Sequence, residues 1–117
     1  MRKLGKLLLT LAIAGSVSTL SANSDLVKQG EKIFNNKKQG NCLACHAVLG
    51  KNIDGPGSMG PQLVGLKYWD DKTLYDTVYD IYSARDVKNT SMPAFGKSGW
   101  LSDDEIKAVV AYLKTID

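Results

Sequence analysis

Apolar residues recur at helical spacing in three segments of this sequence, residues 25–35, 71–83 and the stretch that begins at residue 102. The first segment carries Leu26, Ile33 and Phe34 on one side of the expected helix. Asn23 or Ser24 precedes it and is a residue type that caps helix starts. We therefore predict a first helix over 25–35.

The other two segments have broader apolar faces. Between residues 71 and 83, Leu74, Val78 and Ile81 repeat three or four positions apart, beside a stripe of tyrosines. Ser102 and Glu105 match a capping box. The apolar residues that follow on one face are Ile106, Val109, Val110 and Leu113. We predict second and third helices here.

Long segments without periodicity separate the helices. Residues 36–65 hold six of the 11 glycines together with Pro56 and Pro61, and a second loop runs from 85 to 99. No strand-like alternation, internal repeat or low-complexity tract is present. The pattern predicts an all-α fold of three main helices. Such long loops in a small domain indicate that they wrap around a scaffold, for which a large buried cofactor is suited.

The N-terminal residues have the pattern of a Sec signal peptide. Arg2, Lys3 and Lys6 precede an apolar run over residues 7–20, and the small residues Ser21 and Ala22 follow. The run is shorter than the roughly 20 residues of a membrane-spanning helix. We expect residues 1–22 to be removed on export to the periplasm, leaving one domain over 23–117 without a membrane attachment. An uncleaved membrane anchor is the alternative.

Charge argues against a polyanionic partner. The 117 residues have a net charge of +3, but three of the 15 basic residues lie in the predicted signal peptide, leaving 12 against 12 acidic ones. A domain with so little net charge is a poor ligand for nucleic acid or an anionic membrane surface. We expect neither as a partner.

The strongest chemical signal is a C-x-x-C-H motif formed by Cys42, Cys45 and His46. Its two thiols can add to the two vinyl groups of one haem while the adjacent imidazole reaches the iron. The short spacing places both sulfurs on one edge of the macrocycle. We therefore predict one haem c, bound covalently through two thioethers and ligated by His46.

Other uses of the two cysteines fit the sequence less well. A zinc site needs about four nitrogen or sulfur ligands, and this chain has no third cysteine and no second histidine. A thioredoxin-like redox pair favours a βαβ setting, which the pattern does not show. A plain disulfide suits an oxidising compartment but gives no reason for His46 or for the glycine-rich loop.

The sixth position at the iron is predicted to be Met92. Since His46 is the only histidine, a second imidazole is excluded, and only Met59 and Met92 remain as thioethers beyond Met1. Met92 precedes Pro93, which disfavours helical backbone and places the methionine in a loop. Met59 and an open site are the alternatives. Histidine and methionine ligation raises the reduction potential and suits electron transfer.

Several further residues are candidates for contact with the cofactor. The Pro61 carbonyl is a candidate to accept from the other ring nitrogen of His46, with an ordinary turn as the alternative, and Leu63 follows in the same segment. Arg85 and Lys97 are candidates to pair with propionates, although a solvated surface position is the default for both. An aromatic group is expected mainly to cover the core, with contact to a propionate or a partner as the alternative: Tyr68, Trp69, Tyr75, Tyr79 and Tyr82.

The motifs resemble those of class I cytochromes c over nearly all of residues 23–117. They comprise Gly30-x-x-x-Phe34, C-x-x-C-H, Gly60-Pro61-x-Leu63, Met92 and Ala111-Tyr112-Leu113. The resemblance implies that the first and last helices cross and that the methionine loop closes the distal face of the haem. Phe34 and Tyr112, one in each of these helices, are expected from the sequence to pack together.

A narrower resemblance is to the SoxX family of small monohaem cytochromes. The matching stretches are NCLACHA at 41–47, GPQLVG at 60–65, MPAFG at 92–96 and LSDDEI at 101–106. The resemblance implies a heterodimer with a SoxA-like haem subunit in the SoxAX complex. That complex conjugates thiosulfate oxidatively to a cysteine of the SoxYZ carrier and passes electrons to a downstream cytochrome c.

No catalytic residue is expected in this chain. Both cysteines are used by haem, so no thiol is left for sulfur chemistry, and the L-cysteine S-thiosulfotransferase active site implied by the resemblance belongs to the partner. A free periplasmic cytochrome c that serves an oxidase or reductase is the second hypothesis. A haem enzyme or gas sensor with an open iron is the third, and Met92 argues against it.

Overall fold

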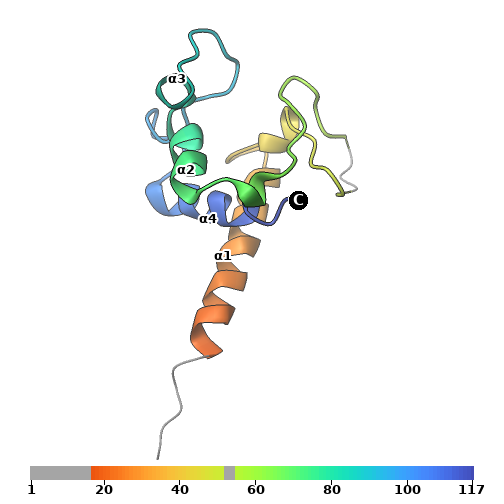
Figure 1. Ribbon diagram of the computed structural model, residues 1–117. Helices are drawn as coiled ribbons and strands as arrows, with labels where there is room; N and C mark the ends of the chain where they lie inside the picture. Colours follow the sequence, from red (N-terminus) through yellow and green to blue (C-terminus); the bar gives the residue numbers. More distant parts are fainter. Residues whose placement is uncertain (1–16, 52–54) are drawn as a thin grey trace, which may run out of the picture.

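The computed structural model describes residues 17–51 and 55–117, with side chains from residue 23 onward. The helices are α1 (Val17–Asn35), α2 (Asp71–Tyr79), α3 (Ile81–Ala84) and α4 (Asp103–Leu113), with short 3-10 turns at Cys42–Ala44 and Leu66–Tyr68 (Figure 1). The described residues contain no strand, only an isolated parallel bridge between Val48 and Leu63. The predicted all-α, class I cytochrome c fold is confirmed.

The crossing of α1 and α4 forms the base of the domain (Figure 1). A Cβ atom at Gly30 would lie 1.9 Å from the carbonyl oxygen of Ala108, so the two backbones touch where the helices cross. One turn further along α1, Phe34 meets Tyr112 edge to face, with ring centroids 5.2 Å apart. The predicted packing of Phe34 on Tyr112 is therefore confirmed.

Helix α1 begins earlier than the sequence pattern predicts. It starts at Val17 and passes through Asn23 and Ser24, which lie inside the helix and do not cap it. Nothing in this stretch breaks a helix, since neither proline nor glycine occurs between Val17 and Gln29. Most of the predicted signal peptide, residues 1–16, lies outside the described residues. Among residues 17–51 and 55–117, no helix is long and apolar enough to span a bilayer.

The single helix predicted over 71–83 is wrong, because the structure divides it at Asp80. This residue adopts an extended conformation with φ −154° and ψ 91°, ending α2 and starting α3. Its carboxylate accepts from the backbone N–H of Tyr82 at 3.2 Å and from the hydroxyl of Ser83 at 2.9 Å. Aspartate competes for local N–H groups in this way and favours a new helix start.

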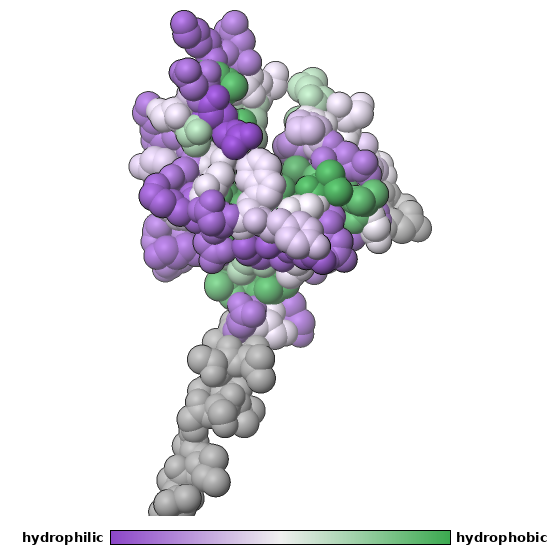
Figure 2. Space-filling view, in the orientation of Figure 1, coloured by the Kyte–Doolittle hydropathy of each residue, from purple (hydrophilic) through white to green (hydrophobic). Residues whose placement is uncertain are grey.

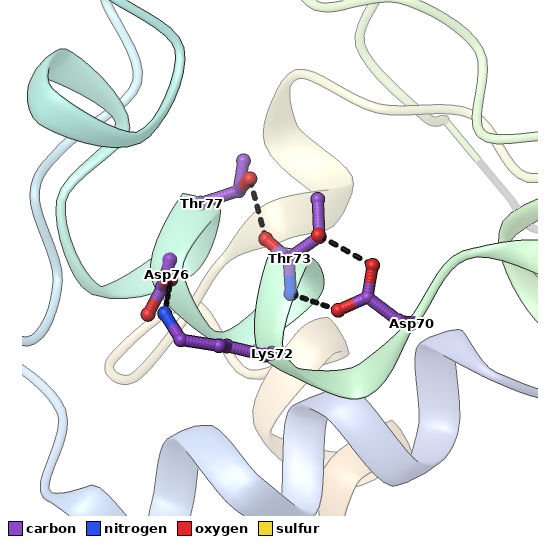
Figure 3. Close-up of polar contacts among 5 residues, drawn as sticks. All are labelled: Asp70, Lys72, Thr73, Asp76 and Thr77. Carbon is purple, nitrogen blue, oxygen red and sulfur yellow. Dashed lines mark hydrogen bonds and ion pairs between the residues drawn. The ribbon is translucent and has the colours of Figure 1, made fainter.

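Polar side chains form hydrogen bonds and an ion pair at the start of α2 and along it (Figure 3). Asp70 accepts from both the backbone N–H of Thr73, at 2.9 Å, and its hydroxyl, at 2.6 Å. The hydroxyl of Thr77 donates to the Thr73 carbonyl at 2.7 Å, and Lys72 pairs with Asp76 one turn along. The apolar side chains Leu74 and Val78 of the same helix are buried.

The core lies between the α1–α4 crossing and α2. Its most deeply buried side chains are Phe34, Ile106, Val109, Tyr112 and Ile116. The backbone N–H of Lys67 donates to the Ile116 carbonyl at 3.0 Å, which ties the turn before α2 to the residues after α4. The apolar faces of α2 and α4 continue from this core into the cavity described below.

The capping box at the start of α4 is confirmed and gives a first prediction. Ser102 accepts from the Glu105 N–H at 3.2 Å, and Glu105 accepts from the Ser102 N–H at 3.0 Å. The Ser102 N–H holds the pKa of Glu105 below its usual value. We expect Ser102→Ala to lower the free energy of unfolding by about 1 kcal/mol, measured by denaturant titration.

The control is Asp104→Ala, which removes an exposed first-turn carboxylate outside the box. It should cost only a few tenths of a kcal/mol through the helix dipole. Equal losses in the two variants would show that the box adds nothing beyond helix-end charge.

Candidate functional site

One cavity of about 980 Å³ lies between the cysteine-containing loop and the α2–α3 segment. Cys42, Cys45 and His46 line one side, and Met92 lines it from the second loop. Figure 2 shows a notch between these two parts of the domain, with apolar surface near its base. The volume is at the upper end of the roughly 300–1,000 Å³ typical of cofactor pockets. The cavity brings together the four side chains that the sequence assigns to thioether bonds and iron ligation.

The C-x-x-C-H segment is a tight turn. Asn41 takes a left-handed conformation with φ 47°, which starts the 3-10 turn Cys42–Ala44. The backbone N–H groups of Cys45 and His46 both donate to the Cys42 carbonyl, at 3.1 and 2.9 Å. The chain therefore reverses within four residues, and both sulfurs and the imidazole face the same space.

The two thiols are partly buried and are not joined by a disulfide. Desolvation raises the pKa of the Cys42 thiol to about 12. A backbone hydrogen bond lowers this pKa and the nearby Cys45 raises it, both by less than desolvation does. Two neighbouring reduced thiols are what addition to the two vinyl groups of one haem requires.

His46 is held by the segment that follows it. Its Nδ1 lies 2.7 Å from the Pro61 carbonyl oxygen, so Nδ1 carries the proton and Nε2 is left free as a ligand. This is the contact that the sequence predicted for Pro61. A Cβ at Gly60 would lie 2.5 Å from Cε1 of His46, so the backbone of residue 60 rests on the imidazole ring. Leu63 lines the same cavity.

The contact between Gly60 and the imidazole gives a second prediction. In Gly60→Ala the added methyl group must push the His46 ring away from its bond with Pro61. We expect the yield of haem-loaded protein to fall at least about tenfold, in line with the 10- to 100-fold effects of disturbing groups that orient metal ligands. The ratio of haem absorbance to protein absorbance measures this yield.

Ser58→Ala is the matched control, because Ser58 is exposed two residues away in the same loop. It should load haem as the unsubstituted chain does. Normal loading and an unchanged haem spectrum in Gly60→Ala would show that the ring position does not depend on this contact.

The two candidate methionines differ in their surroundings. Met92 is partly buried and packs against the hydrophobic core, in the loop opposite the histidine. Met59 is 76% exposed, directly before Gly60 on the histidine side. Both reach the cavity lining, but only Met92 approaches it from the second loop. The geometry therefore favours Met92 as the sixth ligand.

Aromatic and basic residues form the rim of the cavity. The Arg85 guanidinium lies 5.0 Å from the centroid of the Trp69 ring, and both residues line the cavity. Lys97 is not part of the lining and instead pairs with Asp80 at 3.5 Å. Tyr68 is 80% exposed, so it does not cover the core as expected. Pairing of Arg85 with a propionate stays a prediction.

Sequence reasoning missed two groups of residues at this site. The first lines the cavity from α2 and α4 and comprises Leu74, Thr77, Val78, Val109 and Leu113. Their helical periodicity indicated a buried face but not what that face covers. The second is Asp80, which is only 7% exposed and lies at the helix break beside the methionine loop. An aspartate inside an apolar helical pattern was the available signal for it.

The sequence is similar to known proteins in two comparisons. The family model for cytochrome c oxidase, cbb3-type, subunit III matches residues 25–113. An uncharacterized lipoprotein of Aquifex aeolicus (strain VF5) is 37% identical over 93 residues, covering 75% of this chain and 44% of the relative. The cbb3-type cytochrome c oxidase subunit CcoP of Azospirillum sp. (strain B510) is 30% identical over 118 residues, covering 93% and 38%. The chain spans less than half the length of either relative.

Proposed function

This chain belongs to the cytochrome c family described as subunit III of cbb3-type cytochrome c oxidase, and from that premise we propose that it carries electrons through a single haem c in the periplasm. A cytochrome c domain binds haem c covalently, and electron transfer is its role. The bound group would supply an iron that alternates between the ferrous and ferric states. The finer assignments below rest on the cavity.

The observation that carries the proposal is the convergence of both cysteines, His46 and Met92 on one cavity. In the proposed site, Cys42 and Cys45 hold the haem through thioethers and His46 ligates the iron through Nε2. Pro61 keeps the proton on Nδ1. Met92 supplies the sixth ligand, which favours the reduced state and leaves no position for a substrate at the iron.

We further propose that residues 1–22 are a signal peptide and that the haem domain covers 23–117. Support comes from the basic and apolar pattern of the first 22 residues and from the family match, which begins at residue 25. The C-x-x-C-H motif follows this export pattern in the same chain, which is the combination expected of an exported c-type cytochrome.

For the partner, we propose a SoxA-like haem subunit in a SoxAX heterodimer. Four stretches of this chain resemble SoxX, the electron-accepting subunit of that thiosulfate-oxidising complex. The cavity adds an argument from chemistry, since both thiols face it and none is left elsewhere for sulfur transfer. Oxidative conjugation of thiosulfate to the SoxYZ carrier would then occur on the partner, with this chain accepting electrons.

A free carrier that delivers electrons to a terminal oxidase is the second candidate. The observation that favours it is the similarity to one part of a cbb3-type oxidase subunit, CcoP, over 93% of this chain. In this case the domain would donate to an oxidase directly and need no permanent second subunit.

One experiment separates the two partners. The haem-loaded protein is recovered from native periplasm with an affinity tag, and thiosulfate-dependent reduction of its haem is followed with whatever copurifies. Recovery of a second haem protein that is required for reduction supports the SoxAX assignment. If the protein is recovered without a second haem protein and exchanges electrons rapidly with a cbb3-type oxidase, the free-carrier function is supported. The double variant Cys42→Ala, Cys45→Ala, which cannot attach haem, is the control that shows which proteins copurify without haem.

A further inference from the structure

The loop that carries Met92 is fixed to α3 on its N-terminal side. The Tyr82 hydroxyl donates to the backbone carbonyl of Thr90 at 3.1 Å. The Thr90 hydroxyl in turn accepts from the backbone N–H of Met92 at 3.1 Å. Tyr82 is therefore linked to the Met92 backbone through Thr90, which bonds to both.

The same loop is fixed to α2 on its C-terminal side. The Tyr79 carbonyl accepts from the backbone N–H groups of Gly96 and Lys97, each at 3.1 Å. This carbonyl is available because α2 ends at Tyr79; in a continuous helix it would accept from Ser83, four residues on. A Cβ at Gly96 would lie 2.0 Å from the Tyr79 ring, so the close approach depends on glycine.

Asp80 connects the two attachments. Its carboxylate caps α3 through Tyr82 and Ser83, and it pairs with Lys97 of the loop at 3.5 Å. Burial alone would raise the pKa of Asp80, but the Ser83 hydroxyl and the Lys97 ammonium outweigh it and lower that pKa below its usual value. The buried carboxylate is therefore charged at neutral pH and holds both the helix break and the loop.

We propose that Asp80 and Tyr82 are positioning residues that hold the Met92 thioether at the haem iron. The proposal rests on the proposed function, in which Met92 is the sixth ligand. Neither residue needs to touch the iron: the break at Asp80 frees the carbonyl that anchors one side of the loop, and the Tyr82 hydroxyl anchors the other. Without these contacts, the loop over 85–99 would lose its conformational freedom only when Met92 binds the iron, and this entropy cost would weaken the iron–methionine bond.

Competition by imidazole for the ferric iron tests the proposal, because imidazole binds only when the methionine has left. In Tyr82→Phe, loss of one hydrogen bond of about 1 kcal/mol should raise the apparent affinity for imidazole roughly fivefold. Thr90→Val removes the acceptor of the Met92 N–H at nearly constant volume and should act in the same direction. Asp80→Asn, which removes the charge opposite Lys97, should do so as well.

Tyr75→Phe is the matched control. The Tyr75 hydroxyl donates to Asp103 at 2.6 Å, between α2 and α4, and Tyr75 does not line the cavity. This variant loses a hydrogen bond to a carboxylate from the same tyrosine stripe, so it should lower the free energy of unfolding at least as much as Tyr82→Phe. Its affinity for imidazole should stay within about twofold of the unsubstituted protein.

The outcomes separate this proposal from the function on which it rests. The thioether of a bound methionine gives ferric haem a weak charge-transfer band in the far red. If the unsubstituted protein lacks that band, Met92 is not the ligand and both the site assignment and this inference fail. If the band is present and Tyr82→Phe and Thr90→Val bind imidazole as Tyr75→Phe does, only the positioning role is overturned.

Discussion

Replacing Met92 with alanine is expected to open the haem iron to added ligands. Since His46 is the only histidine of the sequence, no second imidazole of this chain can replace the thioether. The reduced variant should bind carbon monoxide stoichiometrically, whereas the unsubstituted protein should bind it only weakly. The reduction potential should also fall, because the thioether ligand raises it. Carbon monoxide difference spectra and a redox titration measure the two effects.

Met59→Ala is the matched control for this experiment. Met59 has the same thioether and also reaches the cavity lining, but it is 76% exposed and lies on the histidine side. Its substitution should leave the spectrum, the potential and the weak carbon monoxide binding unchanged. The reverse pattern, an open iron in Met59→Ala and an unchanged one in Met92→Ala, would move the sixth ligand to Met59.

The contrast between these two methionines shows what the sequence could predict about the site. Its C-x-x-C-H motif is local, so the turn geometry of three residues follows from their spacing alone. Met92 could be chosen over Met59 because Pro93 restricts its backbone to a loop. The contact of Pro61 with His46 was predicted because a carbonyl in the segment 60–63 could accept from the second ring nitrogen of the iron ligand, and it is present at 2.7 Å.

The break at Asp80 shows what the sequence could not predict. Apolar spacing across residues 71–83 is compatible with one helix, and helical periodicity records which side chains are buried, not whether the backbone is continuous. The break is stabilised by long-range partners, because the Tyr79 carbonyl bonds to Gly96 and Lys97, and the Asp80 carboxylate pairs with Lys97 as well. Such contacts, separated by about 17 residues of chain, carry no periodic signal.

Tyrosines of the second helical segment illustrate the same limit. Tyr75, Tyr79 and Tyr82 were predicted mainly to cover the core, yet Tyr79 and Tyr82 are 42% and 40% exposed. The rings of Tyr75 and Tyr79 stack at 5.9 Å, and Tyr79 lies against Gly96 of the methionine loop. The positions of these tyrosines depend on hydrogen bonds to residues later in the chain: Tyr75 bonds to Asp103, Tyr82 to Thr90, and the Tyr79 carbonyl to Gly96 and Lys97.

Substitution of Gly30 by alanine is expected to destabilise the domain more than any other single methyl addition in α1. The new Cβ would lie 1.9 Å from the Ala108 carbonyl oxygen and 2.9 Å from Cβ of Tyr112. Backbone of α4 cannot move aside as a flexible side chain would, so the helices must separate and loosen the contact between Phe34 and Tyr112. We expect a loss of about 3 kcal/mol, at the upper end of overpacking effects, in denaturant unfolding of the haem-loaded protein.

The sign of this effect is the decisive part of the test. At an exposed helical position, glycine to alanine stabilises a helix by up to about 1 kcal/mol, so a helix α1 that did not touch α4 would become more stable. Gln29→Ala is the control, since Gln29 is the exposed neighbour on the same helix and should change the free energy of unfolding by less than about 0.5 kcal/mol. A stabilised Gly30→Ala variant would mean that α1 and α4 do not cross at Gly30. The packing of α1 against α4 would then not hold α4 in place beside the cavity, which Val109 and Leu113 of α4 line.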